Sequence, residues 1–94
     1  MVVQLMYGYQ NKVKAMMFAE AVYITDVICK KYTDAYILTN MNYKNKPRVA
    51  VNVMANQEAI YNMAKEIQDY LQKTVEVMFL KTTEKANLII MEDE

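Results

Sequence analysis

The chain has 94 residues, of which 54% are hydrophobic and 23% charged, and eleven Lys and Arg residues balance eleven Asp and Glu residues. This composition is typical of one globular domain with a modest core, so we expect a single domain over residues 1–94. Zero net charge argues against the bulk attraction that drives nonspecific binding to nucleic acids. No apolar run approaches the roughly 18 residues that cross a bilayer, and a single cysteine forms no internal disulfide, so we expect a cytoplasmic protein without membrane contact.

The residue types that carry most enzyme chemistry are missing. Histidine is absent, which removes the most common general base and transition-metal ligand. One cysteine and one glycine leave no CxxC motif and no Gly-rich phosphate loop. We therefore expect no enzyme activity, no metal and no cofactor. Paired carboxylates or an activated lysine stay formally open, but the acidic residues are scattered over polar faces.

The first predicted element is a strand over residues 2–7. Val3, Leu5 and Tyr7 alternate onto one face, and Gly8 then ends the run. This strand would open the fold.

A long helix is predicted from about Tyr9 to Tyr32, and it is apolar on two faces. With a 100° step per residue, the stripe that faces the core consists of Val13, Met16, Met17, Ile24, Val27 and Ile28. The second apolar stripe lies opposite and consists of Ala15, Phe18, Val22 and Cys29, of which Cys29 itself is expected to be a small buried hydrophobe. Because monomers seldom expose a large apolar surface, we predict that Phe18 and Val22 contact a second protein. In the alternative, the C-terminal elements of the same domain bury both faces.

Glu20 is the polar exception within the core-facing stripe. Burial of an unpaired carboxylate is costly, so we expect either a partner or a head group that reaches the rim near Lys31. A buried Glu20 in a pocket or an interface is the functional alternative.

Two strands and a polar turn follow the helix. Residues 35–41 alternate weakly, residues 42–47 are polar, and Val49, Val51 and Val53 alternate cleanly with their neighbours. This region holds the chain's one local cluster of aromatic and basic residues, which consists of Tyr43, Lys44, Lys46 and Arg48. It is either a solvated turn or, with Phe18 and Val22, part of a partner-binding surface.

A nucleic-acid site is the alternative for the same cluster. Exposed tyrosines, such as an outward-facing Tyr36 or Tyr7, would stack on bases while Lys and Arg bind phosphates. Against it, the expected exterior of the following strand carries Ala50, Asn52 and Met54 without an aromatic residue.

The last third of the chain predicts a helix and two strands. Asn56 is a suitable N-cap, and Ile60, Met63 and Ile67 keep a one-face helical spacing. Residues 74–80 and 88–91 predict the strands. If Met54, Met78 and Met91 lie on the open face of the sheet beside Leu80, a second apolar patch results, which would favour sheet-to-sheet dimerisation.

The predicted order is β-α-β-β-α-β with an extra C-terminal strand. It indicates a ferredoxin-like α+β fold, an antiparallel sheet with two helices on one face. This pattern fixes no activity. We expect a non-catalytic protein-interaction module, namely a small dimeric regulator or inhibitor of a larger protein, which its size and composition suggest is encoded by a phage or mobile element. Binding of single-stranded nucleic acid is the alternative.

Overall fold

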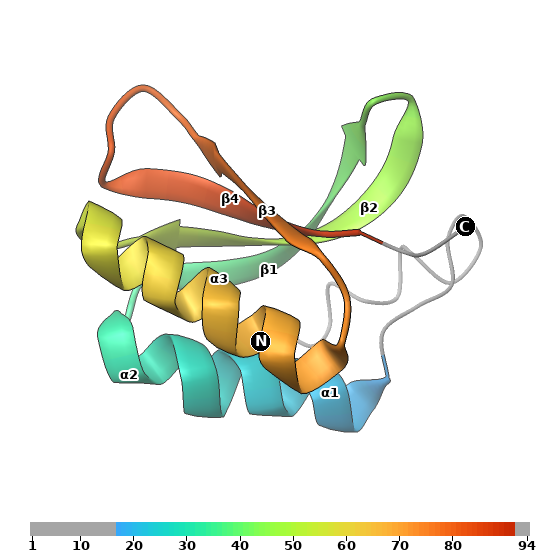
Figure 1. The fold of residues 1–94 in the computed structure, drawn as a ribbon, viewed down its shortest axis with the longest axis horizontal. Coiled ribbons are helices and arrows are strands. Elements are labelled where there is room, and N and C mark those ends of the chain that lie inside the picture. Colours follow the sequence, from blue (N-terminus) through green and yellow to red (C-terminus); the bar gives the residue numbers. More distant parts are fainter. Residues whose placement is uncertain (1–16, 92–94) are drawn as a thin grey trace.

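The computed structural model describes residues 17–91, in which the chain passes twice through a helix followed by a β-hairpin (Figure 1). In chain order the elements are α1 (Phe18–Val22), the π-helix η2 (Tyr23–Cys29), α2 (Lys30–Tyr32), β1 (Tyr36–Tyr43), β2 (Lys46–Met54), α3 (Gln57–Leu71), β3 (Val75–Phe79) and β4 (Lys85–Ile90). The first three segments form one continuous helix, which we call the first helix. The predicted strand at residues 2–7 lies outside the described residues.

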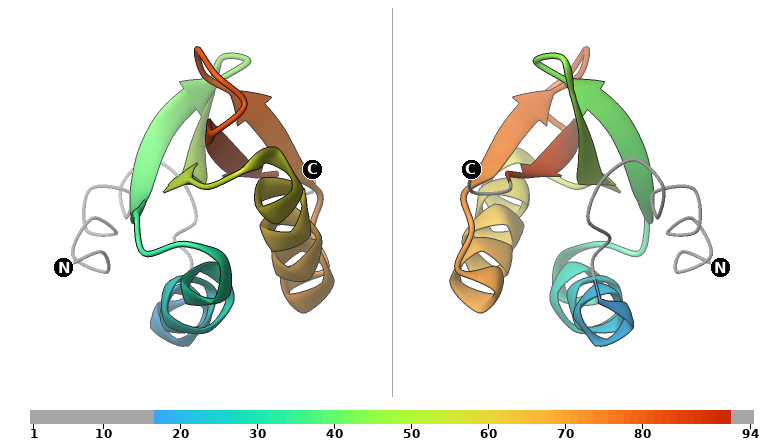
Figure 2. Two further views of the ribbon diagram at one scale, coloured as in Figure 1. Left: turned by 90° about the vertical axis from the view of Figure 1, so that its left-hand side faces the viewer. Right: turned by 90° about the vertical axis from the view of Figure 1, so that its right-hand side faces the viewer.

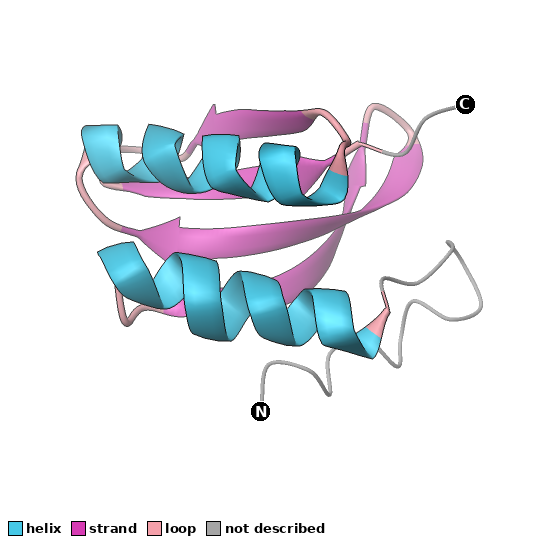
Figure 3. Cartoon of the chain, turned by 60° about the horizontal axis from the view of Figure 1, so that its bottom comes forward, coloured by secondary structure: helices cyan, strands magenta, loops and turns pink. Residues whose placement is uncertain are grey.

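The four strands form one antiparallel sheet in the order β1-β2-β4-β3. Both helices cover the same face of this sheet (Figure 3), and we call the other side the open face. The predicted α+β class, with two helices on one face of an antiparallel sheet, is therefore confirmed.

The exact ferredoxin-like order is not confirmed. The C-terminal strand β4 lies between β2 and β3, at the inner position that the ferredoxin-like pattern gives to its first strand. Leu88, Ile89 and Ile90 are buried on both faces of the sheet, as an inner strand requires. An alternating pattern identifies strands but does not fix their neighbours, so the sequence alone did not reveal this order.

The first helix begins later than predicted and is not a regular α-helix. Met17 is extended, with φ −66° and ψ 148°, and Phe18 is the first helical residue. Glu20 sits in the first turn, where its Oε1 accepts a hydrogen bond of 3.2 Å from the backbone N–H of Met17. This bond satisfies a donor that a helix N-terminus leaves open.

The first helix buries a different stripe from the one predicted. Its buried residues are Ala21, Ile24, Thr25, Ile28 and Cys29, at the three- and four-residue spacing of one helix face. Cys29 therefore lies on the core side and Val27, which is 43% exposed, lies outside it, whereas the predicted core stripe contained Val27. Met17 was also placed in the core and is instead 69% exposed, because it precedes the helix. Ile24 and Ile28 are buried as predicted.

The core lies between the helices and the sheet. Helix α3 begins as predicted, with the Asn56 side chain accepting a 2.8 Å hydrogen bond from the N–H of Ala59. Its buried residues are Ile60, Met63, Ala64 and Ile67. Opposite them, the paired registers align one apolar row across all four strands, consisting of Leu38, Val51, Leu88 and Val77. The helix-facing side of the sheet is thus a continuous apolar surface.

The hairpin between β1 and β2 has a tighter turn than predicted. Lys44 and Asn45 form the turn with φ of 52° and 68°, and Tyr43 pairs with Lys46 at its base. Two consecutive positive φ values are the geometry of a two-residue hairpin turn. The strand β1 therefore extends two residues beyond its predicted end at Met41.

The sheet is strongly bent. Figure 2 shows β1 with β2 and β3 with β4 as the two sides of an inverted V, with the first helix below β1 and α3 below β3. On the open face, the Tyr43 hydroxyl donates a 2.6 Å hydrogen bond to Glu76 Oε1. These residues belong to the two outer strands, about 14 Å apart in a flat sheet. Ala50 and Ile89, both on this face, are fully buried, so the curled sheet shields part of its own open side.

Candidate protein-interaction surface

The predicted partner-binding residues fall into two groups. Phe18 is 68% exposed in the first turn of the first helix, and Val22 is half-buried one turn later. Tyr43, Lys44 and Lys46 lie at the tip of the β1-β2 hairpin. Figure 1 places both groups at the same end of the molecule, one in the helix layer and one in the sheet layer. None of the bonds or ring contacts found within residues 17–91 joins them.

The basic and aromatic residues of the β1-β2 hairpin are engaged in contacts within the protein. The bond to Glu76 holds the ring of Tyr43 over the open face and raises the pKa of its hydroxyl. Lys44 Nζ lies 5.3 Å from the centroid of the same ring. Arg48 is only 7% exposed on the open face. Of the three predicted cations, only Lys44 and Lys46 remain at the surface.

The tyrosines do not form a platform for bases. Tyr36 packs against the hydrophobic core on the helix side of the sheet, and burial raises the pKa of its hydroxyl. The outer side of β2 carries Ala50, Asn52 and Met54, as the sequence indicated. Tyr7, the other predicted outward tyrosine, lies outside the described residues.

Glu20 is half-buried rather than enclosed. Its carboxylate reaches the start of the first helix, where it accepts the bond from Met17. This position resembles neither the predicted contact with Lys31 nor a pocket. Lys31 instead pairs with Glu66, at 2.8 Å.

Several exposed apolar residues lie along the two helices, and we call this set the helix surface. Its exposed fractions are large: Met17 69%, Phe18 68%, Tyr23 37%, Val27 43% and Tyr70 44%. Tyr23 and Tyr70 stack with their ring centroids 4.0 Å apart and their planes at 19°, which joins the first helix to the end of α3. Sequence reasoning predicted only Phe18 of this set. Met17 and Val27 were missed because the regular helical wheel placed them inside.

Polar contacts flank the Tyr23 and Tyr70 stack along the seam between the helices. Glu66 on α3 accepts hydrogen bonds from Lys31 and from the Tyr32 hydroxyl. The bond from Lys31, followed by that from Tyr32, lowers the pKa of Glu66, and the same bonds raise the pKa of both donors. The seam therefore holds the two helices in a fixed relation at neutral pH, with the aromatic pair on the same seam.

The open face carries a second group of exposed apolar side chains. Ile37 is 54% exposed, Met54 48% and Leu80 41%, and Met78 is half-buried on the same face. Asn87, opposite Met78, has a buried Oδ1 without a hydrogen-bond partner within the described part of the chain. Of the patch expected beside Leu80, Met54 and Met78 lie on this face, whereas the half-buried Met91 follows the other end of β4 and does not lie beside Leu80.

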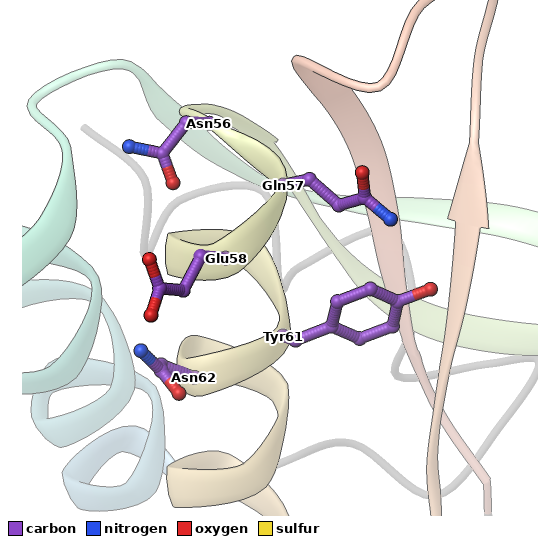
Figure 4. Close-up of a pocket in the computed structure, with 5 residues that line it drawn as sticks. All are labelled: Asn56, Gln57, Glu58, Tyr61 and Asn62. Carbon is purple, nitrogen blue, oxygen red and sulfur yellow. The ribbon is translucent and has the colours of Figure 1, made fainter.

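The hollows that described residues alone line are shallow and open to solvent. A shallow hollow at the start of α3 is lined by Asn56, Gln57, Glu58, Tyr61 and Asn62. In Figure 4, Glu58 and Asn62 point toward the first helix, whereas Gln57 and Tyr61 point toward β3 and β4, so their polar groups do not converge. Residues 17–91 contain no group of three or more acidic or Cys residues placed to hold a metal ion.

The comparisons with known proteins identify no family for this chain. The chain matches no protein-family model, no curated protein and no solved structure. Among residues 17–91, no helix combines the length and apolar character needed to pass through a bilayer. A functional proposal therefore depends on the surface geometry alone.

Proposed function

We propose that this protein is a non-catalytic interaction protein that binds a larger protein through the helix surface. The observation that supports this proposal is the exposure of five large apolar side chains on one pair of helices, two of them more than two-thirds exposed. Large apolar side chains exposed in such number mark interaction sites in proteins of this size. Met, Phe and Tyr are also the residue types that are enriched at such interfaces.

The helix surface has the composition of an interface with a few strong anchors. Phe18 and Met17 project at one end, and the stacked Tyr23 and Tyr70 form a rigid aromatic pair whose conformational freedom is already restricted by the stack. A rigid aromatic group loses little entropy when it binds, so it contributes more to affinity than a mobile one. A small protein with such a surface can regulate or inhibit a larger one by covering its functional site.

The experiment compares capture of partners by wild type and by a Phe18→Lys/Val27→Lys variant, with tagged protein as bait in the native host. Both side chains are exposed, so the variant should fold as judged by circular dichroism and thermal unfolding. We expect a specific co-purifying protein, reduced at least about tenfold by the variant, because a charge on the interface must be desolvated.

The matched control carries Met54→Lys/Leu80→Lys, two similarly exposed residues on the open face. This control should capture the same protein as wild type does. Equal capture by both variants, or no specific protein with wild type, would refute the proposal.

The nucleic-acid alternative has weaker support, because Arg48 is buried, Tyr36 packs on the core and Tyr43 is bound to an acidic residue. Titration of a labelled single-stranded oligonucleotide at low salt tests it directly. Micromolar binding that disappears in a Lys44→Glu/Lys46→Glu variant would favour this alternative over binding of a protein.

A further inference from the structure

The outer strand β1 lacks the features that normally protect the edge of a sheet. Within residues 17–91 it pairs with β2 alone, and its eight residues, Tyr36–Tyr43, include no charged residue and no proline. Its register with β2 runs without a bulge. Natural edge strands usually carry lysine, proline or a bulge, because an unprotected edge pairs with another chain. The other edge strand, β3, has five residues and contains Glu76.

The hairpin register shows which backbone groups of β1 face outward. The two residues that flank a two-residue turn, here Tyr43 and Lys46, bond to each other through the backbone N–H and C=O groups of both. Tyr43 and every second residue before it therefore point their backbone groups toward β2. The bond from Met54 N–H to the Ala35 carbonyl continues this pattern. The backbone N–H and C=O groups that point away from β2, toward the free edge, therefore belong to Tyr36, Leu38, Asn40 and Asn42.

We propose that a second copy of this chain pairs with β1 in antiparallel orientation, with Thr39 on the two-fold axis. In an antiparallel pair, two opposed residues lie on the same face of the sheet, and the backbone groups of both point either toward the partner strand or away from it. The allowed registers therefore pair even-numbered residues with even-numbered ones and odd-numbered residues with odd-numbered ones. The register centred on Thr39 pairs Tyr36 with Asn42 and Leu38 with Asn40 of the second copy. Four such pairs with two bonds each give eight hydrogen bonds, and this register uses all four outward residues.

The side chains of β1 suit this register. Thr39 would face Thr39 of the second copy, and such threonine pairs are favourable across strands. The exposed Ile37 would pack against Met41 of the second copy on the open face, which covers an apolar side chain that is now 54% exposed.

The absence of charge on β1 and the area that pairing would bury are both compatible with a second copy bound at this edge. Two-fold pairing brings a strand against itself, so any central charge would meet its own copy, and β1 has none. Eight residues span about 27 Å, and a sheet plus one helix layer is about 18 Å deep, which gives roughly 1,000 Å² for both copies, the lower limit of specific interfaces.

The inference goes beyond the proposed binding of a larger protein, and the purified chain alone tests it. Light scattering should give a mass of 22.0 kDa, twice the chain mass of 11.0 kDa. Thr39→Lys and Thr39→Glu should each reduce this mass to that of a monomer, and an equimolar mixture of the two variants should restore the dimer. Circular dichroism verifies that both variants fold.

Cross-linking tests the register in a variant that leaves the strand uncharged. In a Cys29→Ala background, Thr39→Cys should form an intermolecular disulfide under mild oxidation, because opposed residues on the axis have Cα atoms about 4.5 Å apart. The control Ile37→Cys would lie four residues from its own copy, about 13 Å away, and should not cross-link.

Three outcomes would overturn the inference. A monomeric wild type would mean that β1 is left open, or is covered by a strand of the same chain or of another protein. A dimer that cross-links through Ile37→Cys but not Thr39→Cys would have another register. A dimer that neither cysteine variant cross-links, and that Met54→Lys/Leu80→Lys separates, would pair through the open face.

Discussion

The position of Cys29 provides a direct test of which face of the first helix is buried. Cys29 is fully buried, and burial raises the pKa of its thiol from 9.0 to about 12. The difference of three pH units lowers the fraction of reactive thiolate by roughly a thousandfold near neutral pH. Exclusion of reagent from the core slows the reaction further. The folded protein should therefore have an almost inert thiol.

The double variant Val27→Cys/Cys29→Ala moves the single thiol from position 29 to position 27. Val27 is 43% exposed, so a cysteine there should react about as fast as a small free thiol. Loss of the buried sulfur should destabilise the fold by about 1 kcal/mol. This is small against the roughly 5–14 kcal/mol expected for 94 residues.

The assay follows release of the coloured thiol from DTNB, with each protein folded and then unfolded in guanidinium chloride. Wild type should react at least about a thousandfold more slowly when folded, and the double variant should react at nearly equal rates in both states. The opposite result, a reactive Cys29 and a protected cysteine at 27, is what the stripe predicted from the sequence would give. It would refute the orientation of the first helix on the core.

Three further predictions concern stability. Leu88→Ala removes a fully buried side chain from the central apolar row and should cost about 2–5 kcal/mol in chemical unfolding. Asn56→Ala removes the N-cap of α3 and should cost about 1 kcal/mol, measured in the same way. Glu66 has a lowered pKa in the folded state, so its contribution is present above the carboxyl's ordinary pKa of 4.5 and is lost as the pH falls through the lower, folded value. Glu66→Gln should therefore lower the melting temperature at neutral pH and leave less acid dependence below pH 4.5 than wild type shows.

The sequence predicted the second half of the fold well, because local signals decide it. Asn56 caps α3, and Ile60, Met63 and Ile67 keep the strict spacing that a single buried face requires. These features depend on neighbours within a few residues, which a linear pattern records.

The buried face of the first helix and the strand order were predicted less well. The predicted stripe was centred on Val13, Met16 and Met17, which precede the helix that begins at Phe18, so it included Val27 and left out the buried Cys29. The inner place of β4 follows from long-range pairing, although the uninterrupted run of Leu88, Ile89 and Ile90 was a usable sign of burial on both faces.

The candidate site was predicted only in part for a similar reason. Phe18 lies at the surface as the two-faced helix suggested, whereas Arg48 is buried and Tyr43 is held by Glu76. The bond between Tyr43 and Glu76 joins the two outer strands across the open face of the bent sheet. The charge and aromatic content of a turn does not encode that curvature.

The inner position of β4 has a consequence for how the protein is made. Each hairpin joins neighbouring residues, but the pairing of β2 with β4 joins residues between 31 (Met54 and Lys85) and 41 (Val49 and Ile90) positions apart. Such distant contacts form late, because the chain entropy of closing the loop is lost before they can form. Because β4 follows the other described strands along the chain, it leaves the ribosome after them, so during synthesis the apolar edge of β2 stays uncovered until β4 has been made.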